Sequence, residues 1–238
     1  MKNVVFVHGA YHAGWCWNEV IKYLPKNNFN CHPLDLPANG SNTSFKKEDV
    51  GIEEYVNYVI DYINSNNLSE IILVSHSLGG LTISRVIEKI PNKIREAFFV
   101  TSVVLNNKNF FSFLPLEIQE RYKQIALSRP DRSIPPNLEK IRQNLFNSSP
   151  DSEELNSFLS KLEPQPIKPY EEIVTLNSFK TSPVPIVYVR CKNDKTLPKE
   201  IFDEIISFLP EKAVIETIDA DHEAMFSNPK AIAELLLR

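Results

Sequence analysis

The chain has 238 residues and a formal net charge of -4, and its composition is 42% hydrophobic and 24% charged. These values are typical of a folded globular protein, and the length is sufficient to bury one large core. With this slightly acidic balance the chain offers no basic surface for nucleic acid or an anionic membrane, so we expect neither as a partner.

No stretch of the sequence approaches the roughly 18 consecutive apolar residues that cross a bilayer. The N-terminal run 4–7 is too short for the core of a secretory signal, and it ends in His-Gly rather than at a cleavage-type site. We therefore expect a cytoplasmic protein. Cys16, Cys31 and Cys191 are widely spaced and form no CxxC pair, which indicates neither a disulfide framework nor a zinc site.

The first part of the chain alternates short apolar runs with amphipathic stretches. Apolar runs at 4–7, 71–74 and 97–100 predict strands, and the mixed segment 30–34 predicts another with a weaker pattern. Apolar residues at helical spacing predict the helices between them, at 17–24, 52–63 and 81–90. This order implies an α/β fold, with a mostly parallel sheet covered by helices on both faces and right-handed crossovers.

The alternation of predicted strands and helices stops in the middle of the chain, where helical patterns are separated by prolines. These patterns lie at 116–125, 138–145 and 155–162. The residues at 151–154 indicate a capping box before the last of them. The proline-rich segment 162–169 predicts extended, stiff backbone. We interpret the whole region as a helical cap inserted over the carboxyl edge of the sheet.

The strand pattern then returns. Runs at 185–190 and 213–218 predict two further strands, each followed by a helix, which gives a sheet of about six strands. The predicted domains are an α/β core formed by 1–105 and 182–238 and a helical cap formed by 106–181.

The segment SHSLGG at 75–80 joins a predicted strand to the next helix through a tight turn. A serine at the tip of such a turn projects beyond the end of the sheet, and the amides after it stand at a helix N-terminus, where negative charge is stabilised. Ser77 is therefore the candidate nucleophile. The match to G-x-S-x-G is imperfect because Ser75 replaces the first glycine, but serine is small enough to fit the corner.

Two further polar residues follow strands in the way Ser77 does. Ligands of an open parallel sheet bind beyond the carboxyl ends of the strands, and Asp194 and His222 both lie there. An imidazole activates a serine hydroxyl best when a carboxylate fixes its tautomer, and the order Ser, Asp, His is the expected one. Asp219 and Asp221 compete for the acid role because they are closer in sequence. We favour Asp194, which comes from the neighbouring strand end, and expect the other two to shape the turn.

A tetrahedral intermediate also requires two amide donors for its oxyanion. The N–H groups of Leu78, after the nucleophile, and of Ala10, after the first strand, are the candidates. Gly9 would let that loop approach closely. We place Gly9, His12 and His76 as candidate pocket residues, with His12 alternatively at the surface and His76 packed beside the turn.

The histidines indicate no metal site, because none of the 5 shows a metal-ligand spacing such as HExxH. His8 is expected to be hydrogen-bonded within its own loop. We therefore expect neither a metal nor a cofactor.

Five stretches of the sequence are similar to those of a known family. These are FVHGAYHAGWCW, LDLPANGSN, ILVSHSLGG, VRCKNDKTLP and IDADHEAMFSNP. They resemble the methylesterase and hydroxynitrile lyase branch of the α/β-hydrolases and its bacterial esterase relatives. The resemblance implies an α/β-hydrolase fold, a Ser77–Asp194–His222 triad, an oxyanion hole from Ala10 and Leu78, and an apolar pocket between sheet and cap. It is also compatible with a homodimer formed through the cap.

Two positions distinguish this chain from the lyases of that branch. The lyases carry a threonine where Gly9 stands and a lysine directly after the catalytic histidine, where this chain has Glu223. A negative charge there disfavours cyanide. We therefore expect a serine hydrolase that cleaves a small, largely apolar ester through an acyl-enzyme. The alternatives are cofactor-free C–C cleavage or cyclisation of a polyketide-type substrate and, with less support, hydroxynitrile lyase activity or non-catalytic ligand binding.

Overall fold

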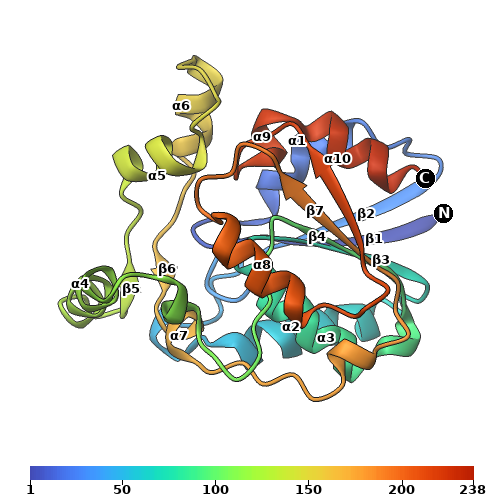
Figure 1. Cartoon of the computed structure of the whole chain (residues 1–238), viewed down its shortest axis with the longest axis horizontal. Helices are drawn as coiled ribbons and strands as arrows, with labels where there is room; N and C mark the ends of the chain where they lie inside the picture. Colours follow the sequence, from blue (N-terminus) through green and yellow to red (C-terminus); the bar gives the residue numbers. More distant parts are fainter.

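Six strands form a single parallel sheet in the order β2-β1-β3-β4-β7-β8 (Figure 1). The computed structural model describes all residues, 1–238. The predicted parallel sheet is confirmed, and β3 is buried along its whole length because helices cover both faces. The strands of this sheet are β1 (Lys2–Val7), β2 (Phe29–Leu34), β3 (Ile71–His76), β4 (Ile94–Val100), β7 (Ile186–Cys191) and β8 (Val214–Ile218).

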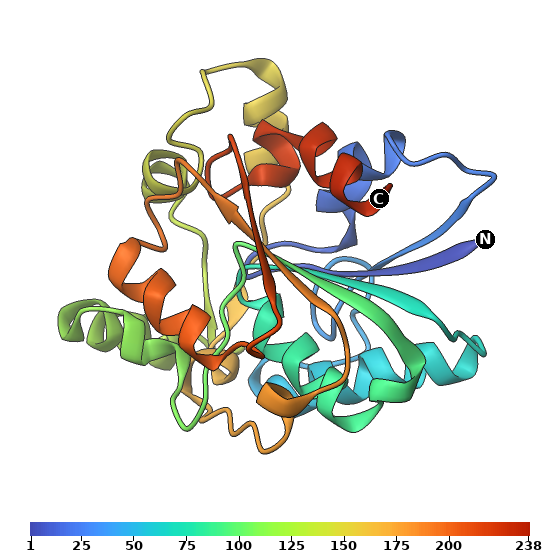
Figure 2. The same ribbon diagram turned by 45° about the vertical axis from the view of Figure 1, so that its right-hand side comes forward.

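The helices of the core lie in two layers, one on each face of the sheet. Helices α1 and α10 cover one face, whereas α2, α3 and α8 cover the other (Figures 1 and 2). None of the helices is long and apolar enough to cross a membrane. Their bounds are α1 (Asn18–Lys22), α2 (Ile52–Ser65), α3 (Gly79–Lys89), α8 (Lys199–Phe208), α9 (Ala224–Ser227) and α10 (Pro229–Leu236).

The helix predicted at 17–24 is shorter than expected. A 3₁₀ turn, Gly14–Trp17, precedes the α-helix, which ends at Lys22. The Trp17 ring packs against Phe6 of β1 at 5.1 Å between centroids, so the first turn of this segment is set by packing on the sheet rather than by helical periodicity.

Between β4 and β7 the chain leaves the sheet and builds a layer of short helices beyond its carboxyl edge (Figure 1). These are α4 (Leu116–Leu127), α5 (Leu138–Leu145), α6 (Glu153–Leu159) and α7 (Lys168–Glu171). The region also contains an antiparallel pair of strands, β5 (Ser133–Ile134) and β6 (Gln165–Pro166). The sequence did not predict this pair, because a strand of two residues is too short to show an alternating pattern.

Two local predictions in this region were wrong in detail. No capping box opens α6. Ser152 Oγ accepts the Leu155 N–H at 3.1 Å, but the apolar side chain of Leu155 cannot accept the Ser152 N–H in return. The segment predicted to be extended over 162–169 already turns into α7 at Lys168, because proline fits the first turn of a helix, where its missing N–H is not needed.

The turn between β3 and α3 is held by close packing. Ser77 adopts a left-handed backbone conformation, with φ of 49°. A Cβ on Gly79 would lie 2.6 Å from the His8 carbonyl oxygen, and one on Gly80 would lie 2.4 Å from the Val103 carbonyl oxygen. Ser75, in place of the usual glycine, is buried and forms a hydroxyl–hydroxyl hydrogen bond of 2.8 Å with a neighbouring serine. The backbone of Ser77 is therefore held between the loops that follow β1 and β4, the two strands next to β3.

We expect Gly80→Ala to destabilise the protein, because its methyl group has no room beside the Val103 carbonyl. Overpacking of this kind typically costs about 1–3 kcal/mol in the free energy of unfolding. Urea denaturation measures the loss. Ser65→Ala, an exposed position at the end of α2, is the matched control and should leave the midpoint nearly unchanged. Equal midpoints for the two variants would contradict the packing described here.

Candidate active site

Three side chains from different strand ends meet beyond the carboxyl edge of the sheet. The Nε2 atom of His222 lies 3.0 Å from Ser77 Oγ, and its Nδ1 atom lies 2.8 Å from Asp194 Oδ2. A carboxylate only accepts hydrogen bonds, so Nδ1 carries the proton and Nε2 is left to accept the serine hydroxyl. The arrangement can transfer a proton from the hydroxyl to the imidazole.

Asp194 is held by donors on several sides. The hydroxyl of Thr101 and the N–H groups of Thr196 (2.7 Å) and Leu197 (3.1 Å) donate to its carboxylate. Burial raises the pKa of Asp194, but His222 and these hydrogen bonds outweigh that effect and hold the pKa well below its usual range. The sequence analysis missed Thr101, whose only signal was its place directly after the fourth strand.

The imidazole of His222 is buried beside several carboxylates. Burial lowers the pKa of His222, but the negative charges of Asp194, Glu223 and Asp221 outweigh it, so that the pKa lies above its ordinary value. The site therefore stabilises the charged form of the imidazole.

The two aspartates nearest His222 in sequence contact other groups. Asp219 is exposed and accepts a hydrogen bond of 2.8 Å from Asn193. Asp221 accepts from the hydroxyls of Ser148 (3.0 Å) and Ser149 (2.9 Å), which lie between α5 and α6. Asp221 thus connects the strand-end loop to the helical layer.

Two backbone amides next to Ser77 are free to bind an anion. The N–H groups of Ala10 and Leu78 donate no hydrogen bond within the protein, and both residues line the same cavity as Ser77 and His222. The Ala10 loop is fixed from behind, because His12 Nδ1 donates to the Ala10 carbonyl at 2.7 Å. Paired free amides of this kind can stabilise an oxyanion.

The cavity lies between the sheet edge and the helical layer and has a volume of about 440 Å³. This is within the range of small-molecule sites. Much of its wall is apolar and comes from α4 and α5. The residues concerned include Ile118, Ile125, Ile141 and Leu145.

Of the three candidate pocket residues, only His76 lines the cavity. The Nε2 atom of His76 donates to the carbonyl of His222 at 3.0 Å. Gly9 lies behind the wall, where a Cβ would come within 2.9 Å of His76 Nδ1 and Ser77 Cβ. His12 is neither at the surface nor among the residues that line the cavity. His8 is buried, and its Nδ1 donates to the Gly9 carbonyl at 2.8 Å.

Glu223, which the sequence analysis used only to distinguish the chain from lyases, lines the cavity and is fully buried. One of its oxygens lies 3.4 Å from Nε2 of His12. One ring nitrogen each of His76 and His222 and one oxygen of Glu223 lie within 4.8 Å of one another. Both ring nitrogens of His222 are already hydrogen-bonded, so a metal ion bound there would have to displace Ser77 or Asp194.

Comparison with known proteins gives consistent matches. The model of the "Alpha/beta hydrolase family" matches residues 4–235. Methylesterase 7 of Arabidopsis thaliana is 28% identical over 247 residues, which cover 99% of this chain and 95% of that protein. A solved extracellular α/β-hydrolase from a Paenibacillus species, described as sharing structural and functional homology with tobacco salicylic acid binding protein 2, superposes with a TM-score of 0.88 at 22% identity, covering 100% of this chain and 98% of that one. Tomato methylketone synthase I, complexed with 2-tridecanone, superposes with a TM-score of 0.75 at 25% identity, covering 99% of this chain and 96% of that one.

We expect the pKa of His222 to lie above the ordinary histidine value of about 6.5, because Asp194 stabilises its charged form. In Asp194→Asn this charge is removed and the pKa should fall. Histidine proton resonances followed by NMR over a pH series measure both values. Asp219→Asn, which removes an exposed charge from the loop before His222, is the control. A His222 pKa that is the same in the wild type and in Asp194→Asn would refute this electrostatic account.

Proposed function

The chain belongs to the α/β-hydrolase family, and from that premise we propose that it is a serine hydrolase that cleaves a small, largely apolar carboxylic ester. The observation that carries the proposal is the continuous contact from Ser77 through His222 to Asp194, beside two unpaired amides in one cavity. Relatives at this similarity that are named methylesterases support ester cleavage.

In the first half-reaction, Ser77 Oγ attacks the ester carbonyl carbon while His222 Nε2 takes the hydroxyl proton. The carbonyl oxygen becomes an oxyanion and accepts hydrogen bonds from the N–H groups of Ala10 and Leu78. Losing one donor of this kind typically costs about 3 kcal/mol of transition-state stabilisation. Asp194 holds His222 in the required tautomer and stabilises its positive charge.

The tetrahedral intermediate then collapses. The C–O bond to the alcohol breaks, the imidazolium of His222 gives its proton to the departing oxygen, and the acyl group stays on Ser77 as an ester. In the second half-reaction a water molecule loses its proton to His222 and attacks this acyl-enzyme. The proton returns to Ser77 Oγ as the carboxylic acid leaves. Water is the only co-reactant.

The shape of the cavity supports an apolar substrate. Its wall from α4 and α5 offers branched aliphatic side chains, which favour an apolar acyl or alcohol group through the removal of apolar surface from water.

A second candidate function is cofactor-free C–C bond cleavage or cyclisation on the same residues. The similarity to methylketone synthase I favours it. The two candidates differ in their substrates, so a panel of esters and β-keto acids assayed side by side separates them.

We expect Ser77→Ala to abolish both the hydrolysis of p-nitrophenyl acetate and covalent labelling by a fluorophosphonate, because the attacking oxygen is removed. Ser75→Ala, two residues earlier and still within β3, is the matched control and should keep both. Labelling without ester turnover in the wild type would favour the C–C chemistry. An unlabelled wild type, or full activity in Ser77→Ala, would contradict the proposed nucleophile.

We also expect a characteristic pH dependence. The imidazole of His222 must be neutral to accept the serine proton, and its pKa is raised. The value of kcat/KM should therefore rise with pH through a midpoint above about 6.5 and then level off. Steady-state assays over a buffer series measure the midpoint. A midpoint close to that of an ordinary carboxyl group, about 4, would identify a carboxylate instead of His222 as the base.

A further inference from the structure

Glu223 places a negative charge in the wall of the cavity, immediately after the histidine that contacts Ser77. We propose that this carboxylate binds a primary ammonium group of the substrate, so that the ester hydrolysed is an apolar amino ester with its amine close to the scissile carbonyl. The proposal rests on ester hydrolysis at Ser77 and adds the class of substrate.

The carboxylate of Glu223 is charged and lacks hydrogen-bond donors. Its side chain is fully buried, and neither oxygen accepts a hydrogen bond within the protein. Burial raises the pKa of Glu223, but the electrostatic attraction of the neighbouring histidines, His12 first, outweighs it and lowers the pKa to about 2. A buried carboxylate without donors is costly, and a ligand that supplies them is correspondingly favoured.

The two histidines beside Glu223 cannot fully supply those donors. His76 donates through Nε2 to a carbonyl, and burial lowers its pKa to about 3, so the neutral ring leaves only a lone pair at Nδ1. His12 likewise uses its Nδ1 proton on the Ala10 carbonyl. Its Nε2 faces the Oε2 atom of Glu223 at 3.4 Å and offers a proton there only when the ring is charged. Even then the Oε1 atom remains without a donor.

The position of Glu223 suits a group with several donors. One of its oxygens lies within 4.8 Å of a ring nitrogen of His76 and of one of His222. Two hydrogen bonds of about 2.8 Å from one tetrahedral nitrogen span acceptors roughly 4.6 Å apart, so the separation between these groups is one that an ammonium can bridge. Because His222 contacts Ser77 directly, an amine bound here lies near the acylated carbon.

The other charges around the cavity favour the same orientation. Arg121 of α4 and Lys140 of α5 line the cavity on the side of the helical layer, and neither forms a salt bridge. Both are exposed. The cavity therefore has cations at its outer side and a carboxylate at its inner end, which directs an ammonium group towards Glu223 and away from the helices.

The test compares two esters of the same shape at a pH where the amine is protonated. Phenylalanine methyl ester carries the ammonium group, and methyl 3-phenylpropanoate lacks it. For the intact wild-type protein we expect kcat/KM to favour the amino ester by about 10- to 100-fold, as expected for a charge-assisted hydrogen bond. In Glu223→Gln the ratio of kcat/KM for the two esters should fall to about one, because any change in the basicity of His222 acts on both esters alike.

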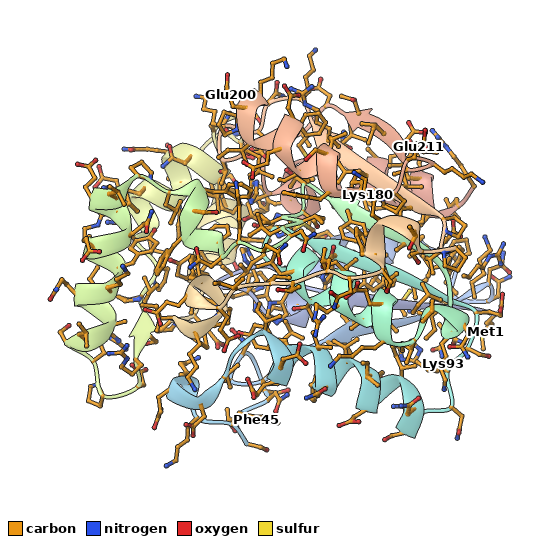
Figure 3. The ribbon with its side chains drawn as sticks, turned by 60° about the horizontal axis from the view of Figure 1, so that its bottom comes forward. Met1, Phe45, Lys93, Lys180, Glu200 and Glu211 are labelled. Carbon is orange, nitrogen blue, oxygen red and sulfur yellow. The ribbon has the colours of Figure 1, made fainter.

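Glu211→Gln is the matched control. It makes the same substitution in an exposed turn between α8 and β8, on the side of the molecule away from the helical layer (Figure 3), and should keep the preference. A second measurement needs no variant. On the wild type, 2-phenylethylamine should inhibit p-nitrophenyl acetate hydrolysis at least about tenfold more strongly than 2-phenylethanol, which has one neutral donor.

The outcomes separate this proposal from the proposed function. Hydrolysis of p-nitrophenyl acetate without a preference for the amino ester or the amine would overturn the ammonium site alone. Equal losses for both esters in Glu223→Gln would also overturn it and assign the residue a structural role beside His222. Equal inhibition by the amine and the alcohol would indicate a neutral-donor site instead. A wild-type protein that hydrolyses no ester would overturn both proposals.

Discussion

The hydrogen bond between His222 and Asp194 is the interaction on which the proposed chemistry depends. It fixes which ring nitrogen carries the proton, and thereby leaves the other to accept from Ser77. This contact joins loops after β7 and β8, and Thr101 after β4 supports it from a third. The parallel sheet makes such convergence geometrically simple, because all of its strands end at one edge. The fold thus acts mainly by bringing distant segments to one place.

A second constraint is steric and lies in the turn after β3. The positive φ of Ser77 requires the following helix to begin very close to the neighbouring loops, and Gly79 and Gly80 provide that space. The same close approach leaves the Leu78 amide free, next to Ser77. Packing, backbone strain and the free Leu78 amide are therefore parts of one local structure.

Much of this could be predicted from the sequence because the signals are local. Short apolar or mixed segments located all six strands of the large sheet, and the strand ends indicated that Ser77, Asp194 and His222 would lie together. Other features were missed because they depend on contacts between distant segments. The β5–β6 pair is too short for periodicity, and the burial of Glu223 against His12 joins residues 211 positions apart. No spacing rule connects such a pair.

The central claim is that Ser77 carries the acyl group during turnover. The most direct measurement is rapid-quench mass spectrometry of the wild-type protein with p-nitrophenyl acetate, followed by peptide mapping. The account predicts a burst of p-nitrophenolate close to the enzyme concentration if deacylation is slow, and in every case an acetyl group on the peptide that contains Ser77. Steady product formation with no acetylated peptide at any quench time, or acetylation confined to another residue, would contradict it.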